Sequence, residues 1–236
     1  MTSSTVPVVM NWSSGKDAAL AYHLLLRENN YKVTHLLTTL SEEYGRVFMH
    51  GIREKLLDIQ AQRMKLPMLK VRLPASPDDS LYRNAMMETL AGLKAQGITT
   101  AAYGDIFLED LRIYREQQLA QAGITALFPL WKKDTRQLIQ AIEQAGIEAL
   151  VVCVNEKYLG KEFLGKQIKA DFLDSLPANV DPCGENGEFH TFVYHAPFFS
   201  SPIPIVTGEI VHKTYTSSEN SEWDTGFYFM DVDSNG

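Results

Sequence analysis

The feature that most constrains the fold is an alternation of strand-like and helix-like apolar patterns along most of the chain. Residues 6–12 form an apolar run of strand length, after which Ala18, Tyr22 and Leu25 recur at helical spacing. The expected later strands are residues 33–40, 68–73, 99–103, 124–130 and 148–154, and the expected later helices are residues 52–64, 78–96, 108–122 and 134–145. Strands that alternate with helices predict an α/β fold with a parallel, helix-covered sheet.

The last part of the chain has a different pattern. From about residue 180, aromatic and β-branched runs at residues 188–194, 205–216 and 225–232 are separated by Pro, Gly and Ser, which favours hairpins. We therefore expect a smaller C-terminal α+β domain at residues 129–236, after a first domain at residues 1–128. Residues 233–236 are expected to form a frayed tail.

Composition excludes several classes of protein. The 236 residues are 45% hydrophobic, which is enough for one large core or two modest ones. A net charge of -7 argues against sequence-independent binding of nucleic acid. The longest apolar stretch, residues 149–154, is far shorter than a membrane span, and the first seven residues show no secretory signal, so we expect a cytoplasmic protein without a membrane partner. The spacing of Cys153 and Cys183 supports neither a disulfide framework nor a zinc site.

Residues 13–18, Ser-Ser-Gly-Lys-Asp-Ala, lie between the first strand and the first helix. Backbone N–H groups and the positive helix end favour an anion at such a position. Ser13 can accept a bond from a free helix N–H, Gly15 lets the backbone approach a phosphate, and Lys16 supplies charge, while Asp17 is a candidate magnesium ligand. The alternative is an ordinary helix start with a serine cap and an acidic first turn.

This loop does not fit the two commonest phosphate-binding motifs. Met10 stands where a Walker A loop requires glycine, Asp17 takes the place of its Ser/Thr, and no GxGxxG follows the strand. The loop instead resembles the pyrophosphate loop SGGxDS of the N-type ATP pyrophosphatases, which cleave ATP between the α and β phosphates. Ser14 replaces a glycine of that loop and Ala18 replaces its final serine, so one hydroxyl contact to pyrophosphate is missing.

Three further segments extend this resemblance over nearly the whole chain. They are Gly-Asp-Ile at residues 104–106, Phe-Pro-Leu-Trp at residues 128–131, and Asp-Pro-Cys-Gly-Glu-Asn-Gly-Glu-Phe-His-Thr at residues 181–191. Together they resemble the diphthine-ammonia ligase family, which amidates diphthine, a modified histidine on elongation factor 2, with ATP and ammonia. The resemblance implies a Rossmann-like domain of the adenine nucleotide alpha hydrolase type, with a smaller domain over its cleft. It also implies Mg²⁺, an acyl-adenylate intermediate, and release of AMP and pyrophosphate.

The resemblance and the residue patterns together give a set of candidate site residues. The expected ATP-binding residues are Ser13, Ser14, Gly15, Lys16, Asp17, Ala18, Thr39, Gly104 and Asp105. The expected catalytic residues are Lys16, Asp17, Glu185, Glu188 and His190. The expected substrate-binding residues are His50, Arg53, Glu185, Glu188, His190 and Thr191. For Thr39 and Asp105, a plain strand end or turn is an equally good interpretation, and for His50 and Arg53 a capped, solvated helix start is the somewhat better one.

The segment around Asn186-Gly187 carries the second half of the predicted site. This dipeptide is a strong signal for a two-residue hairpin, with Glu185 and Glu188 at its shoulders. On a strand, Glu188 and His190 share a face, so we expect Glu188 to help His190 take a proton from ammonium, with Thr191 turned the other way. A solvated hairpin with a surface histidine is the alternative, and a metal site lacks a third ligand at motif spacing.

Three functions remain open at this point. The first is an AMP-forming amide ligase whose partners are ATP, ammonia and a carboxylate acceptor. The second has the same adenylation step but another acceptor, such as a small carboxylic acid or a tRNA base. The third is a nucleotide-binding protein without turnover, suggested by Ser14 and Ala18. Position 2 is Thr2 rather than cysteine, so we expect no built-in glutaminase. A homodimer is compatible with each function.

Overall fold

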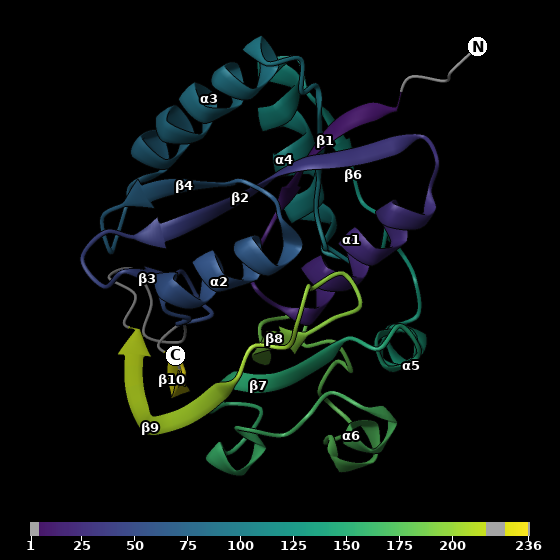
Figure 1. Ribbon diagram of the computed structural model, residues 1–236. Coiled ribbons are helices and arrows are strands. Elements are labelled where there is room, and N and C mark those ends of the chain that lie inside the picture. The colour runs from purple at the N-terminus through teal and green to yellow at the C-terminus, as the bar shows by residue number, and fades with distance from the viewer. Residues whose placement is uncertain (1–4, 216–224, 236) are drawn as a thin grey trace.

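The computed structural model describes residues 5–215 and 225–235 and contains two sheets (Figure 1). The strands of the first sheet are β1 (Val6–Asn11), β2 (Tyr31–Ser41), β3 (Arg46–Val47), β4 (Met68–Leu73), β5 (Thr100–Ala102) and β6 (Thr125–Leu127). The parallel strands lie side by side in the order β4-β2-β1-β5-β6, and the short β3 runs antiparallel to the end of β2. The direction of chain progression therefore reverses between β1 and β5, which is where open α/β sheets bind their ligands.

Helices cover both faces of this sheet. They are α1 (Lys16–Arg27), α2 (Glu54–Met64), α3 (Asp79–Ala95), α4 (Glu109–Ala122) and α5 (Thr135–Gln144), followed by the 3-10 turn η1 (Lys161–Phe163) and the short α6 (Ala170–Ser175). In Figure 1, α3 and α4 lie on one face and α1 and α2 on the other. Within the described residues, no helix is long and apolar enough to cross a membrane.

The burial of β1 follows from this arrangement. Val8 and Met10 are fully buried in the cluster that contains the apolar face of α1, whereas Val9 is fully buried in the cluster with Leu90 of α3 and Leu119 of α4. Successive side chains of a strand point to opposite faces, so a central strand covered on both sides must be apolar throughout. The prediction of a strand buried on both faces is confirmed.

The second sheet is antiparallel. Its strands are β7 (Glu148–Asn155), β8 (Phe189–His195), β9 (Ile205–Tyr215) and β10 (Thr225–Ser234), in the order β8-β7-β10-β9. The predicted fold class, a helix-covered parallel sheet with a smaller C-terminal part, is confirmed. The domain boundary at residues 128/129 stays a prediction. Thr216, which the sequence assigned to a strand, lies outside the described residues.

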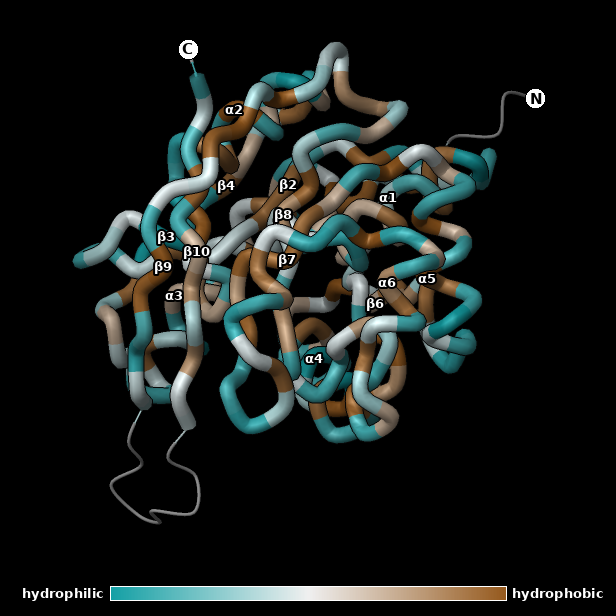
Figure 2. Tube along the Cα trace, turned by 90° about the horizontal axis from the view of Figure 1, so that it is seen from below, coloured by the Kyte–Doolittle hydropathy of each residue, from teal (hydrophilic) through white to brown (hydrophobic). Residues whose placement is uncertain are grey.

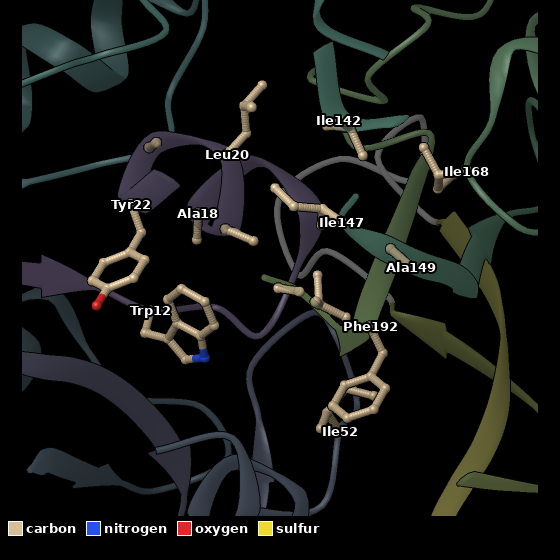
Figure 3. Close-up of a cluster of buried hydrophobic side chains, with 14 of the residues drawn as sticks. Trp12, Ala18, Leu20, Tyr22, Ile52, Ile142, Ile147, Ala149, Ile168 and Phe192 are labelled. Carbon is tan, nitrogen blue, oxygen red and sulfur yellow. The ribbon is translucent and has the colours of Figure 1, made fainter. Parts of the chain in front are cut away.

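One hydrophobic core joins the two sheets. Trp12 and Leu20 belong to the same buried cluster as Ala149 of β7 and Phe192 of β8, part of which is drawn in Figure 3. The Trp12 indole N–H donates to Gln60 Oε1 at 2.8 Å, and Gln60 Nε2 donates to the carbonyl oxygens of Ser14 (3.2 Å) and Val193 (2.7 Å). A shared core with satisfied buried polar groups holds the second sheet in place against the first.

The chain end differs from the prediction of a frayed tail. Asp233 and Ser234 belong to β10, where they pair with Val206 and Ile205, and the Asn235 N–H donates to the Pro204 carbonyl at 3.0 Å. The prediction was wrong for these residues because a small, polar chain end can be held by the backbone bonds of a sheet. Gly236 lies outside the described residues.

The predicted hairpin at Asn186-Gly187 is also absent. The residues before β8 form successive turns, in which the Gly184 N–H donates to the Asp181 carbonyl (2.9 Å) and the Gly187 N–H donates to the Gly184 carbonyl (3.0 Å). Gly184 and Gly187 have φ angles of 69° and 83°, a region that favours glycine. The Asn-Gly signal marked a turn correctly, but β8 pairs with β7 rather than with the segment before it.

Candidate functional site

A cleft of about 430 Å³ lies at the carboxyl ends of β1, β2 and β5, under the turn segment of residues 181–188 and the start of β8. It brings together most of the predicted site. The predicted residues that line it are Ser13, Lys16, Asp17, Ala18, Thr39, His50, Gly104, Asp105, Glu185, His190 and Thr191. Four others, Ser14, Gly15, Arg53 and Glu188, do not line it. The cleft thus stands at the point where the strand order reverses.

Ser14 and Gly15 belong to the loop and set its backbone conformation without lining the cleft. Ser14 is buried and has a φ of 72°, a left-handed conformation that is unfavourable for serine and free for glycine. Its carbonyl accepts a bond from the Val193 N–H at 2.9 Å, which anchors the loop to β8. A Cβ on Gly15 would lie 3.1 Å from His50 Cε1 and 3.3 Å from the Thr191 carbonyl, so the loop packs tightly here. Ser14 therefore occupies a backbone position suited to glycine.

Lys16 joins α1 to the segment above the cleft. It is only 1% exposed, and its Nζ donates to Asp17 Oδ2 at 2.8 Å and to the Cys183 carbonyl at 2.5 Å. Its backbone N–H donates to Thr191 Oγ1 at 3.0 Å. Burial works to lower the pKa of Lys16, but the nearby Asp17 and Glu185 carboxyl groups outweigh it, so the pKa lies above its ordinary value. Lys16 remains a cation in the cleft.

Asp17 presents an unused oxygen beside this cation. Its Oδ1 atom is buried and makes no hydrogen bond within the described residues. Burial raises the pKa of Asp17, and Lys16 opposes that rise. The described residues contain no group of three or more His, Cys, Asp or Glu side chains arranged to hold a metal ion. A magnesium ion at Asp17 would therefore take its other ligands from phosphates and water, which is its usual coordination in nucleotide sites.

The loop after β5 forms the opposite wall of the cleft. A Cβ on Gly104 would lie 2.8 Å from the Ala18 nitrogen, so only glycine lets this loop contact the start of α1. Asp105 forms an ion pair with Arg115 of α4, with 2.6 Å between Oδ2 and Nε. The Arg115 guanidinium also lies 4.3 Å from the centre of the Tyr103 ring. Arg115 is thus held inside the cleft wall by a carboxylate and an aromatic face.

Sequence reasoning missed Arg115. Arg115 was not among the predicted site residues, and Arg112 of the same helix pairs with Glu116, with 2.8 Å between Nε and Oε1. The Arg115 side chain packs instead against Tyr103 and Asp105, which follow β5. The sequence signal for a buried arginine was Asp105, because a carboxylate at the end of a buried strand needs a positive partner.

Glu185 connects the turn segment of residues 181–188 to the loop after β5. Its Oε1 accepts bonds from the backbone N–H groups of Ile106 (2.7 Å) and Phe107 (3.4 Å). Burial, followed by the negative charges of Asp17 and Asp105, raises the pKa of Glu185 from 4.5 to about 7, although the two backbone bonds work in the other direction. Glu185 is therefore a carboxyl group that changes its charge near neutral pH.

Glu188 does not join His190 in the cleft. Its carboxylate is buried and accepts bonds from the Asp181 N–H (3.0 Å) and from the backbone N–H and side-chain amide of Asn186 (both 2.9 Å). It therefore stabilises the turn before β8. The prediction that Glu188 and His190 act side by side is not supported, because β8 begins at Phe189 and Glu188 belongs to the turn.

His190 has a different neighbour, His50. The two ring centroids are 4.5 Å apart, and His190 Nε2 is buried without a hydrogen-bond partner in the part of the chain that the structure describes. Burial, with His50 and Lys16 nearby, holds the pKa of His190 well below 6.5. Burial lowers the pKa of His50 to about 4, with Lys16 acting in the same direction. Both rings are therefore uncharged at neutral pH.

Arg53 lies outside the cleft. It forms ion pairs with Asp231, through Nε at 3.0 Å and Nη2, and with Asp233 at 3.6 Å. Arg46 of β3 donates to the same Asp231 carboxylate at 2.9 Å. These residues link β3 and the start of α2 to β10. Arg53 was predicted to bind substrate from the family resemblance, but its side chain pairs with carboxylates of β10 in the contact between the two sheets.

Comparisons with known proteins agree with this geometry. A family model described as the diphthamide synthase N-terminal domain matches residues 6–126, and one described as the diphthamide synthase C-terminal domain matches residues 134–233. A Danio rerio protein named diphthine--ammonia ligase is 24% identical over 190 residues, which cover 73% of this chain and 74% of that protein. A Bos taurus protein of the same name is 22% identical over 188 residues, covering 72% and 70%.

A Schizosaccharomyces pombe protein named diphthine--ammonia ligase is 31% identical over 104 residues, which are 42% of this chain and 17% of that protein. The matched N-terminal segment contains the loop of residues 13–18, and the matched C-terminal segment contains the turn segment above the cleft. On the evidence of two family models that together span most of its length, the chain belongs to the diphthamide synthase family.

Proposed function

We propose that this protein is an ATP-dependent amide ligase that activates the carboxylate of diphthine on elongation factor 2 and transfers ammonia to it. The observation that carries the proposal is the ion pair between the buried Lys16 and the half-buried Asp17 at the start of α1, which faces a cleft at the switch point of a diphthamide synthase fold. An anion-binding helix end, a buried cation and an unused carboxylate oxygen are what a triphosphate with magnesium requires. Relatives that match most of this chain are named diphthine--ammonia ligase.

The chemistry of the cleft lining favours one orientation of a nucleotide. The loop residues Ser13 and Lys16 suit the phosphates. Leu37 and Thr39 of β2 and Met86 of α3 suit the adenine ring and the ribose. In this orientation the β and γ phosphates lie at the loop and the α phosphate faces the interior of the cleft.

In the first step, an oxygen of the acceptor carboxylate attacks the α phosphate. The new bond joins the acyl oxygen to phosphorus, the bond between the α phosphorus and the bridging oxygen breaks, and pyrophosphate leaves. Lys16 stabilises the charge that develops on the leaving pyrophosphate, and its fixed position means that it needs no rearrangement during the reaction. A magnesium ion held by Asp17 would supply further positive charge at the phosphates.

In the second step, ammonia attacks the acyl carbon, the bond to AMP breaks, and one proton must be removed from nitrogen. Glu185 is the best-matched base, because its pKa of about 7 is close to the working pH. His190 was predicted for this role, but a pKa well below 6.5 makes it a weak base. His190 and His50 instead offer uncharged imidazole nitrogens to the acceptor beside the loop. Ammonia enters from solution or from a partner.

The test is to incubate the purified protein with Mg-ATP, ammonium and elongation factor 2 that carries diphthine. The nucleotide products are separated, and the mass of the acceptor is measured. We expect AMP rather than ADP, with the mass change of an acid-to-amide conversion. AMP without that change would assign the adenylation chemistry to another carboxylic acid, and intact ATP would contradict the proposal.

A further inference from the structure

A second cavity of about 410 Å³ lies on the other side of residues 47–49 from the cleft. Val47, Phe48 and Met49 line both spaces, so this short segment is the wall between them. Beyond the wall, the second cavity is lined by Ser41, Tyr44, Arg46, Gly51, Ala75, Val211, Lys213, Tyr215, Phe229, Met230 and Asp231. It therefore lies between the end of β2 with β3 on one side and β9 with β10 on the other, and Figure 1 shows β9 curving toward β3.

The lining of this cavity is aromatic and open to solvent. Tyr44 is 59% exposed, Met49 51% and Tyr215 49%, while Phe229 of β10 packs on Gly51 at the base. A monomeric protein seldom exposes a contiguous group of large apolar side chains unless something binds there.

Among the strands that the structure describes, β9 adds an unpaired backbone edge to this apolar surface. It stands last in the strand order β8-β7-β10-β9, and its residues from Val206 to Tyr215 are all exposed. Val211, Lys213 and Tyr215 alternate along the face that lines the cavity, so Ile210 and His212 belong to the opposite face. Figure 2 shows β9 and β10 together at one side of the molecule, close to β3. A free edge of this length can pair with an extended segment of another chain.

The charges of the cavity favour an acidic ligand. Asp231 is occupied by Arg46 and Arg53. The Lys213 ammonium lies 4.6 Å from the centre of the Tyr44 ring, and it forms no ion pair with any residue that the structure describes. A cation that lies on an aromatic face and has no ion-pair partner among the described residues can take up a carboxylate from another chain.

We propose that this cavity and the edge of β9 are the docking site of the acceptor protein, a proposal that rests on the function proposed above. An extended acceptor segment pairs with β9, places a bulky apolar side chain in the cavity, and sets an Asp or Glu side chain against Lys213. The adjoining modified side chain then passes the wall at Met49, reaches His50 in the cleft, and brings its carboxylate to the α phosphate. The shared wall favours the acceptor, since the acceptor must reach both the cavity and the cleft at once, whereas ATP needs only the cleft.

The experiment compares two neighbouring residues of β9. Val211 (43% exposed) lines the cavity and Ile210 (49% exposed) does not, so Val211→Asp and Ile210→Asp introduce the same charge at matched exposure on opposite faces. We measure KM and kcat for diphthine-bearing elongation factor 2, KM for ATP, and direct binding of the acceptor by calorimetry.

Val211→Asp should raise the acceptor KM and Kd roughly tenfold, as expected when an apolar contact is lost. Its kcat and its KM for ATP should not change, and Ile210→Asp should resemble the unmodified protein. Lys213→Ala should also weaken acceptor binding, and more so at low salt than at high salt.

The outcomes separate this proposal from the proposed function. Unchanged acceptor KM and Kd in Val211→Asp, with normal turnover, would overturn the docking site and leave the function intact. Acceptor binding that is weakened by Val211→Asp, in a protein that forms no AMP, would support the docking site and contradict the function. An unmodified protein that does not bind the acceptor would contradict the docking site. Loss of self-association by Val211→Asp in ultracentrifugation, with the acceptor KM unchanged, would assign the surface to a second copy of this chain and also overturn the proposal.

Discussion

The cleft and the second cavity are similar in size and opposite in chemistry, although they share one wall. The cleft has its working side chains fixed by bonds between distant parts of the chain, such as Lys16 to Cys183 and Glu185 to Ile106. The second cavity has exposed aromatic side chains and an unpaired strand edge. Fixed charges suit a reaction with a defined geometry, whereas an open apolar surface suits recognition of another chain. The following changes test whether this division holds, and they run from the largest expected effect to the smallest.

Replacing Lys16 with methionine, which is similar in length, should have the largest effect. We expect kcat/KM for AMP formation to fall roughly 1000-fold, because a fixed positive charge beside the leaving group is lost. Steady-state kinetics measures this, with thermal denaturation as the check on folding. Lys32→Met, at an exposed position of β2, is the control and should change neither kcat/KM nor the thermal stability. Near-normal turnover in Lys16→Met would mean that the cleft is not the centre of the chemistry.

Glu185→Gln should lower kcat about 100-fold at pH 8 while keeping the acceptor oxygen for the Ile106 N–H. In the unmodified protein, the basic form of Glu185 appears above its pKa of about 7, so kcat/KM should rise with pH through that value. The variant should lack this rise. Because the pKa is raised on folding, the native state holds a proton between pH 4.5 and 7 that the unfolded state has lost. The contribution of this group to the free energy of unfolding therefore falls as the pH rises through that window. An unaltered pH profile in Glu185→Gln would exclude it as the base.

Gly104→Ala tests the contact between the loop after β5 and α1. The added Cβ would lie 2.8 Å from the backbone of Ala18, so we expect a loss of about 2 kcal/mol in the free energy of unfolding, together with weaker ATP binding. Urea denaturation and calorimetry measure the two effects. Gly92→Ala, within α3 and without any atom nearby, is the matched control and should stabilise the protein by roughly 0.5–1 kcal/mol. Equal effects of the two changes would show that the loop can move aside.

Asp231→Asn should have the smallest effect. It removes the carboxylate that Arg53 and Arg46 share, and because these groups are partly exposed we expect a loss of about 1 kcal/mol in the free energy of unfolding at pH 7. The hydrogen bond from Arg53 lowers the pKa of Asp231, so this contribution is complete above its ordinary value of 3.8 and disappears as the pH falls below it. Urea denaturation at pH 7 and pH 3 measures both values. Asp233→Asn, whose ion pairs are more exposed, should cost less, and a larger loss there would place the link between the sheets elsewhere.

The regular part of the fold could be predicted because its signals are local. The apolar run of β1 and the helical spacing of α1 needed no knowledge of distant residues, and both elements occur close to where they were expected. The loop between them was predicted to bind phosphate from equally local signals. The short β3 and the full succession of turns before β8 were not predicted, although Asn-Gly marked one turn. β3 depends on its pairing with β2, and the turn segment is held by Glu188 and by the contact with Lys16.

The sequence by itself determined the alternation of strands and helices, the position of the loop at residues 13–18 and the family resemblance, because each depends on neighbouring residues. Only the tertiary structure decided that Glu188 supports a turn while Glu185 reaches the cleft, that His50 contacts His190, and that Arg53 pairs with Asp231. Only the tertiary structure placed an exposed strand edge and an aromatic cavity beside the cleft. The physical reason is that the direction of a side chain and the pKa of its group depend on partners far away in the sequence, which local spacing does not encode.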